Sequence, residues 1–134
     1  MKQLALQTLY ANYQVLKKEK RAEMLYLYFN HSAFKNLHME EIFHVGREAL
    51  KDQKQFWEDW IVLLKNKQGD IAGRLLKDAV LYSQGIDGLV HIADESAAVH
   101  PSLYLAAMDV YGKAQDYEKI EKQGKKFLRR LTDN

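Results

Sequence analysis

Apolar residues recur every three or four positions along nearly the whole chain, and this spacing limits the fold more than any other feature. The segment 117–131 is typical, because Ile120, Phe127 and Leu131 fall on one side of a helix. No stretch of five residues between turn signals alternates apolar and polar side chains as a strand does. Seven glycines and one proline are also too few for the frequent turns of a β-sandwich. The sequence therefore predicts an all-α fold.

The spacing and its interruptions predict about eight helices in a single domain, 1–134. Gly69 and Gly85 are expected to end helices, Asp116 to cap the last one, and Pro101 to lie in a first turn. The expected helices cover roughly 2–18, 22–30, 36–50, 53–66, 70–84, 86–97, 101–111 and 117–131. Connections of about two to six residues make neighbouring helices antiparallel.

Composition limits the chemistry and the cellular location expected of the protein. The chain has no cysteine, which excludes disulfides, thiol nucleophiles and thiolate zinc sites. No apolar run exceeds six residues, which is too short to cross a membrane, and the first 20 residues do not resemble a secretory signal. These features favour a cytoplasmic protein that is not bound to a membrane. The chain is expected to be either a complete protein or a segment of a larger one.

The segment 101–131 carries the most specific pattern in the sequence. A large residue, a small residue and a tyrosine are spaced along one helix, and an aromatic residue opens the next: Tyr104, Ala107, Tyr111 and Tyr117. This unit resembles a tetratricopeptide repeat, and the segment 70–99 resembles one more weakly, with Leu75, Ala79 and Tyr82. The resemblance implies stacked antiparallel hairpins in a right-handed superhelix. The alternative is an irregular helical bundle.

The resemblance implies a non-catalytic scaffold that binds a protein or a peptide along the inner helices of its hairpins. The positions expected to be exposed there, and to bind the partner, are Leu76, Val80, Leu105 and Asp109. A homodimer formed through the ends of the array is the other arrangement considered. No cofactor is expected.

Two other functions remain open from the residues. A helical bundle with a small-ligand or metal pocket would use His38, Glu41 and His44, since residues three apart project from one helical face. That pattern is only half of a di-iron carboxylate site, because no second Glu-x-x-His occurs. The chain also lacks the nucleophile elbow, phosphate loop and dinucleotide fingerprint of common enzyme classes. The sequence therefore predicts that the protein is not an enzyme.

The third hypothesis is a weak nucleic-acid-binding module. It comes from the uneven distribution of charge along the chain. Residues 70–111 hold six acids and two bases, a net charge of −4, whereas residues 113–134 hold seven bases and four acids, a net charge of +3. The bases of the last helix that would contact phosphates are Lys119, Lys122, Lys125, Lys126, Arg129 and Arg130. A total charge of only +2 argues against nucleic acid as the partner.

Overall fold

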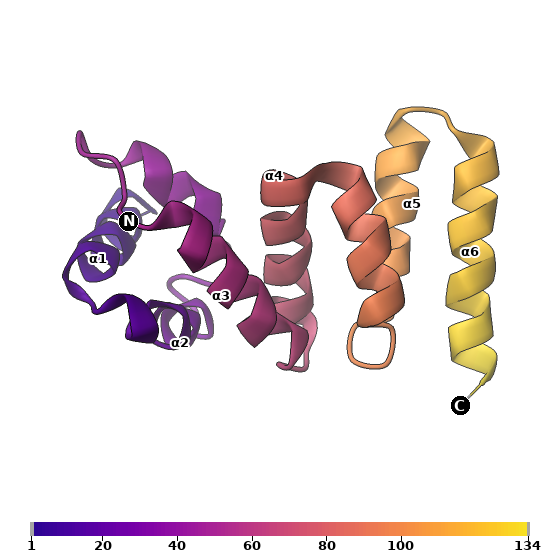
Figure 1. Cartoon of the computed structure of the whole chain (residues 1–134), viewed down its shortest axis with the longest axis horizontal. Coiled ribbons are helices and arrows are strands. Elements are labelled where there is room, and N and C mark those ends of the chain that lie inside the picture. Colours follow the sequence, from indigo (N-terminus) through magenta and orange to yellow (C-terminus); the bar gives the residue numbers. More distant parts are fainter. Residues whose placement is uncertain (1, 134) are drawn as a thin grey trace.

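The computed structural model describes residues 2–133, and within them every regular element is a helix (Figure 1). The elements are α1 (Lys2–Val15), α2 (Lys18–Phe29), a 3₁₀ helix η1 (Met39–His44), α3 (Gln53–Lys65), α4 (Asp70–Glu95), α5 (Leu103–Lys113) and α6 (Tyr117–Thr132). The prediction of an all-α fold is confirmed. None of these helices is both long enough and apolar enough to cross a lipid bilayer.

The prediction of a helix over 36–50 is wrong. Only Met39–His44 is helical there, as a 3₁₀ helix, and the backbone is irregular from Val45 to Asp52. Met39, Ile42 and Leu50 are buried, but residues 46–49 between them are exposed, so no continuous buried face supports a helix beyond Val45. The structure contains seven helical elements within residues 2–133 and not the eight that were expected, because the expected helices 70–84 and 86–97 form the single bent element α4.

The helix α4 is sharply bent at the predicted position. Gly85 has a φ of 76° and a ψ of −167°, a conformation that glycine adopts readily and other residues rarely do. Figure 1 shows that the two arms of α4 run antiparallel on either side of this bend. The expected end of a helix at Gly85 is therefore observed as a reversal of the chain within α4.

Consecutive helices pack against one another along the chain. Contacts join α1 to α2, α2 to α3, α3 to α4, α4 to α5 and α5 to α6, while η1 lies against α1 and α4. In Figure 1 the arms of α4, then α5 and α6, stand side by side. The N-terminal part of the core is built on aromatic rings, with the Trp60 ring 5.8 Å from Phe29 and 5.6 Å from Phe56.

The helix α6 is the last in this row, and α5 is the element that it packs against. It begins where the sequence predicts, because the Asp116 side chain accepts a hydrogen bond from the Lys119 backbone N–H at 3.3 Å. Gln123 is the only fully buried residue of α6, whereas the first arm of α4 buries six. The row of helices therefore ends on one that is covered on a single side.

Candidate partner-binding surface

The four residues predicted to bind a partner divide into two pairs. Leu76 and Val80 are fully buried, so the expectation that they are exposed is wrong. The arm of α4 that carries them packs between neighbouring helices and therefore buries more than one face. Leu105 is 45% exposed, and Asp109 is exposed and pairs with Lys113 at 3.4 Å. Only the α5 pair therefore remains available to a partner.

Two glycines show how α5 and α6 are aligned. A Cβ placed on Gly124 would lie 3.4 Å from the Met108 side chain, and one placed on Gly112 would lie 3.9 Å from Ile120. Since the helices are antiparallel, the start of α5 lies beside the end of α6 (Figure 1). Helical spacing puts Leu105 on the same face of α5 as Met108 and Gly112.

The same spacing places a row of α6 side chains on the face that carries Gly124. The apolar members of this row are Tyr117, Leu128 and Leu131, which are 71%, 61% and 53% exposed, and the exposed Glu121 belongs to the same row. Because Gly124 lies against Met108, this row runs beside the row of α5 that contains Leu105. We call the four exposed apolar side chains the C-terminal flank: Leu105, Tyr117, Leu128 and Leu131.

The other side of the same hairpin is closed by polar contacts to α4. Asp94 accepts hydrogen bonds from the Tyr104 hydroxyl and from the Lys126 ammonium group, each at 3.1 Å. Burial, and then the bond to Asp94, raises the pKa of Tyr104 above its ordinary value, so the hydroxyl keeps the proton that it donates. Lys126 and Leu128 are two residues apart, which is about 200° around a helix. The C-terminal flank therefore faces away from this network.

Positive charge is concentrated near the end of α6. Residues 122–130 contain five bases and no acid. Lys126 is used by Asp94, and Lys125 pairs with Glu121 at 2.9 Å. Lys122 and Arg129 form no ion pair with any residue in 2–133. Lys122 precedes Gly124 by two residues, and Arg129 precedes Leu131 by two, so both cations project from the side of α6 that faces away from the Gly124 row.

The predicted metal ligands are not brought together. The Glu41 side chain accepts a hydrogen bond from the His38 backbone N–H and pairs with Lys2 at 2.9 Å, and His44 is exposed. Burial raises the pKa of Glu41, but its bonds to Lys2 and to the His38 N–H outweigh that effect and lower it. Glu41 therefore caps η1 and ties it to α1.

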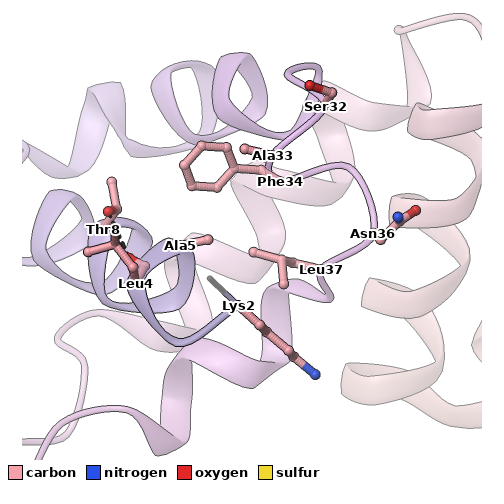
Figure 2. Close-up of a pocket in the computed structure, with 9 residues that line it drawn as sticks. All are labelled: Lys2, Leu4, Ala5, Thr8, Ser32, Ala33, Phe34, Asn36 and Leu37. Atoms are coloured by element: carbon pink, nitrogen blue, oxygen red, sulfur yellow. Dashed lines mark hydrogen bonds between the residues drawn. The ribbon is translucent and has the colours of Figure 1, made fainter.

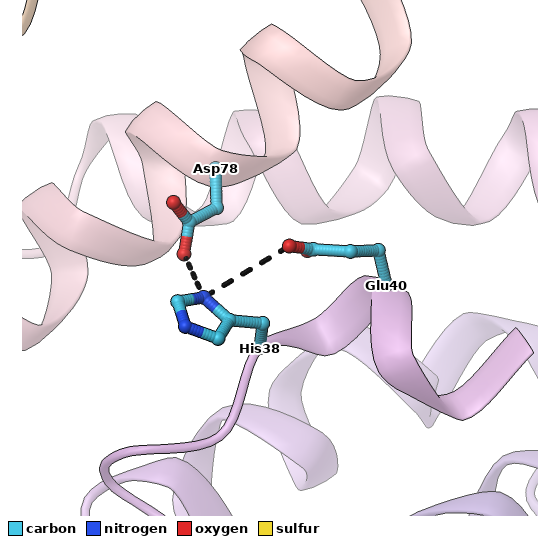
Figure 3. A group of neighbouring side chains, drawn as sticks. All are labelled: His38, Glu40 and Asp78. Atoms are coloured by element: carbon cyan, nitrogen blue, oxygen red, sulfur yellow. Dashed lines mark hydrogen bonds and ion pairs between the residues drawn. The ribbon is translucent and has the colours of Figure 1, made fainter.

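A different group, His38 with Glu40 and Asp78, forms one cluster across the junction of η1 and α4 (Figure 3). His38 Nδ1 lies 2.7 Å from Asp78 Oδ2 and 3.9 Å from Glu40 Oε1. Figure 3 shows the two carboxylates directed at one imidazole nitrogen, with Asp78 coming from α4. This is the only such group of metal-ligating side chains within the described residues.

Cations of the protein already surround this cluster. The Arg74 guanidinium is 3.3 Å from Asp78 Oδ2 and 3.4 Å from His38 Nδ1, and the Lys77 ammonium group is 3.5 Å from Asp78 Oδ1. Arg74 also donates hydrogen bonds to the backbone carbonyls of Leu37 and Lys35. A metal ion would have to displace these positive charges. The arrangement instead fastens the segment before η1 onto α4.

A hollow of about 570 Å³ lies between α1 and the segment 32–37 (Figure 2). Figure 2 shows Phe34 and Leu37 directed toward Ala5, whereas the amine of Lys2 points away from them. The Thr8 hydroxyl donates to the Leu4 carbonyl. The hollow therefore offers apolar contact without a charged group aimed into it, unlike most small-molecule sites.

The exposure of Leu128 and Leu131 was not predicted from the sequence, which placed Leu131 on the apolar side of the last helix. No local signal indicates it, because the apolar residues of α6 span only about 100° around the helix, as they do on an ordinary helix that packs against a neighbour. Comparison with known proteins found no match among family models, curated proteins or solved structures.

Proposed function

We propose that the protein is a non-catalytic scaffold of the helical-repeat type, related in architecture to tetratricopeptide repeats, which binds a protein or peptide on its C-terminal flank. One observation carries the proposal: the last helix leaves Leu128 and Leu131 exposed near Leu105, and Tyr117 exposed about 17 Å farther along the same face. Clustered exposed apolar side chains mark interaction surfaces more often than single ones do. A scaffold built from stacked helices commonly binds through such surfaces.

The chemistry of the remaining clusters supports this assignment over the alternatives. The titratable groups at the junction of η1 and α4 are occupied by Arg74 and Lys77. The hollow beside Phe34 has no convergent polar groups. The C-terminal flank needs neither a cofactor nor a reacting group in order to act. We therefore assign binding to this surface and expect Leu105 to contribute to it, together with Asp109 at its edge.

The proposal is tested by capture of partners from a lysate of the source organism. The wild-type chain is compared with Leu105→Glu, Leu128→Glu and the control Val62→Glu, whose side chain on α3 is 60% exposed. A partner that binds the C-terminal flank should be lost with the first two variants and retained with the control. Circular dichroism checks that all variants keep their helix content. Equal capture by all four proteins would reject the proposal.

A further inference from the structure

We propose that α1 is the contact of a homodimer, in which the outer faces of two α1 helices pack antiparallel around a two-fold axis. The inference goes beyond the proposed function and does not depend on it, because α1 and α6 lie at opposite ends of the molecule (Figure 1). It rests on the exposed side chains of α1, on the absence of charge among them and on their symmetric spacing.

The outer face of α1 carries a row of accessible side chains. Leu9 and Tyr13 are fully buried on the inner side of this helix, against the rest of the fold. Leu4 and Val15 are instead 58% and 79% exposed. Helical spacing aligns them on the outer side with the half-buried Thr8 and the exposed Ala11. We call this row the α1 strip: Leu4, Thr8, Ala11 and Val15.

The α1 strip lies in a segment without charge. Residues 3–16 contain no acidic or basic side chain and no histidine. At the start of α1, the charge of Lys2 is offset by Glu41 at 2.9 Å. The outer face of α6, at the other end of the molecule, instead carries four exposed charged residues: Glu118, Glu121, Lys125 and Arg129. A charged partner would lose solvation on the α1 strip without gaining an ion pair, whereas a second α1 strip would not.

The spacing of the α1 strip is the same in both directions. Its intervals are four, three and four residues, so the row is symmetric about the midpoint between residues 9 and 10. A two-fold axis at that midpoint would pair Leu4 with Val15 at both ends of two antiparallel helices, and Thr8 with Ala11 in the middle. The small central residues would let the helices approach closely, and the larger terminal ones would fill the space where crossed helices diverge.

The two edges of the α1 strip fit the same symmetry. One edge carries the amide side chains of Gln3, Gln7 and Gln14. Along the other edge lies the hollow beside Phe34, which Leu4 and Thr8 help to line (Figure 2). The two-fold axis would place glutamines beside glutamines and one hollow beside the other. Amides both donate and accept hydrogen bonds, so they are able to pair with amides of a second copy.

Sedimentation equilibrium of the full chain from about 5 to about 500 µM tests the inference. From Leu4 to Val15 there are 11 residue steps, about 17 Å of helix axis. This contact is smaller than a stable interface of about 800 Å² per partner, so we expect a dimer that dissociates in the micromolar range. Raising the salt concentration should not weaken it, because the α1 strip has no charge to screen.

Ala11→Glu places a charge at the centre of the α1 strip and should raise the dissociation constant of the dimer at least about tenfold. The control Val62→Glu, on α3, where the side chain is 60% exposed, should leave that constant within about twofold. Circular dichroism checks that both variants keep their helix content. A chain that stays monomeric at about 500 µM, or a dimer equally stable in Ala11→Glu, would overturn the inference.

A mixture of two variants tests the antiparallel pairing. Leu4→Lys and Val15→Glu should each be monomeric alone, because each would bury an unpaired charge at the contact. Mixed in equal amounts they should form a heterodimer, since the introduced lysine of one chain would meet the introduced glutamate of the other. Parallel helices would place Leu4 beside Leu4, so a mixture no more dimeric than its components would overturn the antiparallel arrangement.

Other uses of these surfaces would give different results. A dimer that is lost with Leu128→Glu but not with Ala11→Glu would overturn the inference in favour of pairing through the C-terminal flank. A monomer that binds phosphatidylserine vesicles, and loses them with Ala11→Glu, would overturn it in favour of a membrane surface. The capture experiment with Leu105→Glu and Leu128→Glu changes no residue of α1, so the proposed function stands or falls separately.

Discussion

Arg21 is a buried cation that joins two helices through a single side chain. It is 5% exposed, and its Nε donates to the Tyr13 carbonyl at 2.8 Å, in the last turn of α1, where carbonyls lack helical partners. Its guanidinium lies 4.3 Å from the centre of the Tyr13 ring and 3.4 Å from Asp52. A side chain of α2 therefore caps the end of α1.

We expect Arg21→Lys to lower the free energy of unfolding by about 1–3 kcal/mol, because lysine lacks the planar fork that serves the carbonyl, the carboxylate and the ring together. Urea denaturation followed by circular dichroism measures the change. The exposed neighbour Lys20 provides the control, and Lys20→Ala should change stability by no more than about 0.5 kcal/mol. Equal effects of the two substitutions would show that Arg21 does not cap α1.

At the scale of one element, Gly85 and Gly112 have opposite roles, since Gly85 forms the bend of α4 and Gly112 lies within the regular helix α5. Gly85 has a positive φ, and a Cβ added there would meet nothing within 4 Å, so Gly85→Ala tests backbone conformation alone. We expect it to destabilise the protein by about 1–3 kcal/mol. Gly112 lies within α5, where a Cβ would meet only Ile120 at 3.9 Å. Gly112→Ala should stabilise the protein by about 0.5–1 kcal/mol.

Differential scanning calorimetry of Gly85→Ala and Gly112→Ala shows whether each substitution raises or lowers the Tm. A fall in Tm for Gly85→Ala together with a rise for Gly112→Ala is the expected pattern. If Gly85→Ala raised the Tm, α4 would be a straight helix in solution and the antiparallel arms seen in Figure 1 would be wrong.

Stability should be distributed unevenly across the whole molecule. The first arm of α4 buries six residues between neighbouring helices, whereas α6 packs against α5 and buries one. Local opening requires less free energy where fewer apolar contacts are lost. We therefore expect backbone amides in α6 to exchange with deuterium faster than those in 70–84. Hydrogen exchange followed by mass spectrometry tests this, and equal protection of the two segments would contradict it.

Local signals predicted the elements with good accuracy where the signals lie within one helix. The expected helix 53–66 is Gln53–Lys65 in the structure, and the expected last helix begins after its Asp116 cap. Gly85 was expected to end a helix and does reverse the chain. The segment 36–50 was predicted wrongly, because its short apolar period is satisfied by a 3₁₀ turn docked onto α1 and α4. That docking depends on residues far away in the sequence.

Outside 36–50, the sequence by itself determined which segments form helices and which side of each helix is apolar, because spacing and caps act over a few residues. Only the tertiary structure decided which of those apolar sides are covered. Leu76 and Leu105 occupy similar apolar helices, yet one is fully buried and the other is 45% exposed. His38 and Asp78 are 40 residues apart and meet only because η1 packs on α4. Burial and long-range contacts depend on neighbouring helices, and no local pattern specifies that arrangement.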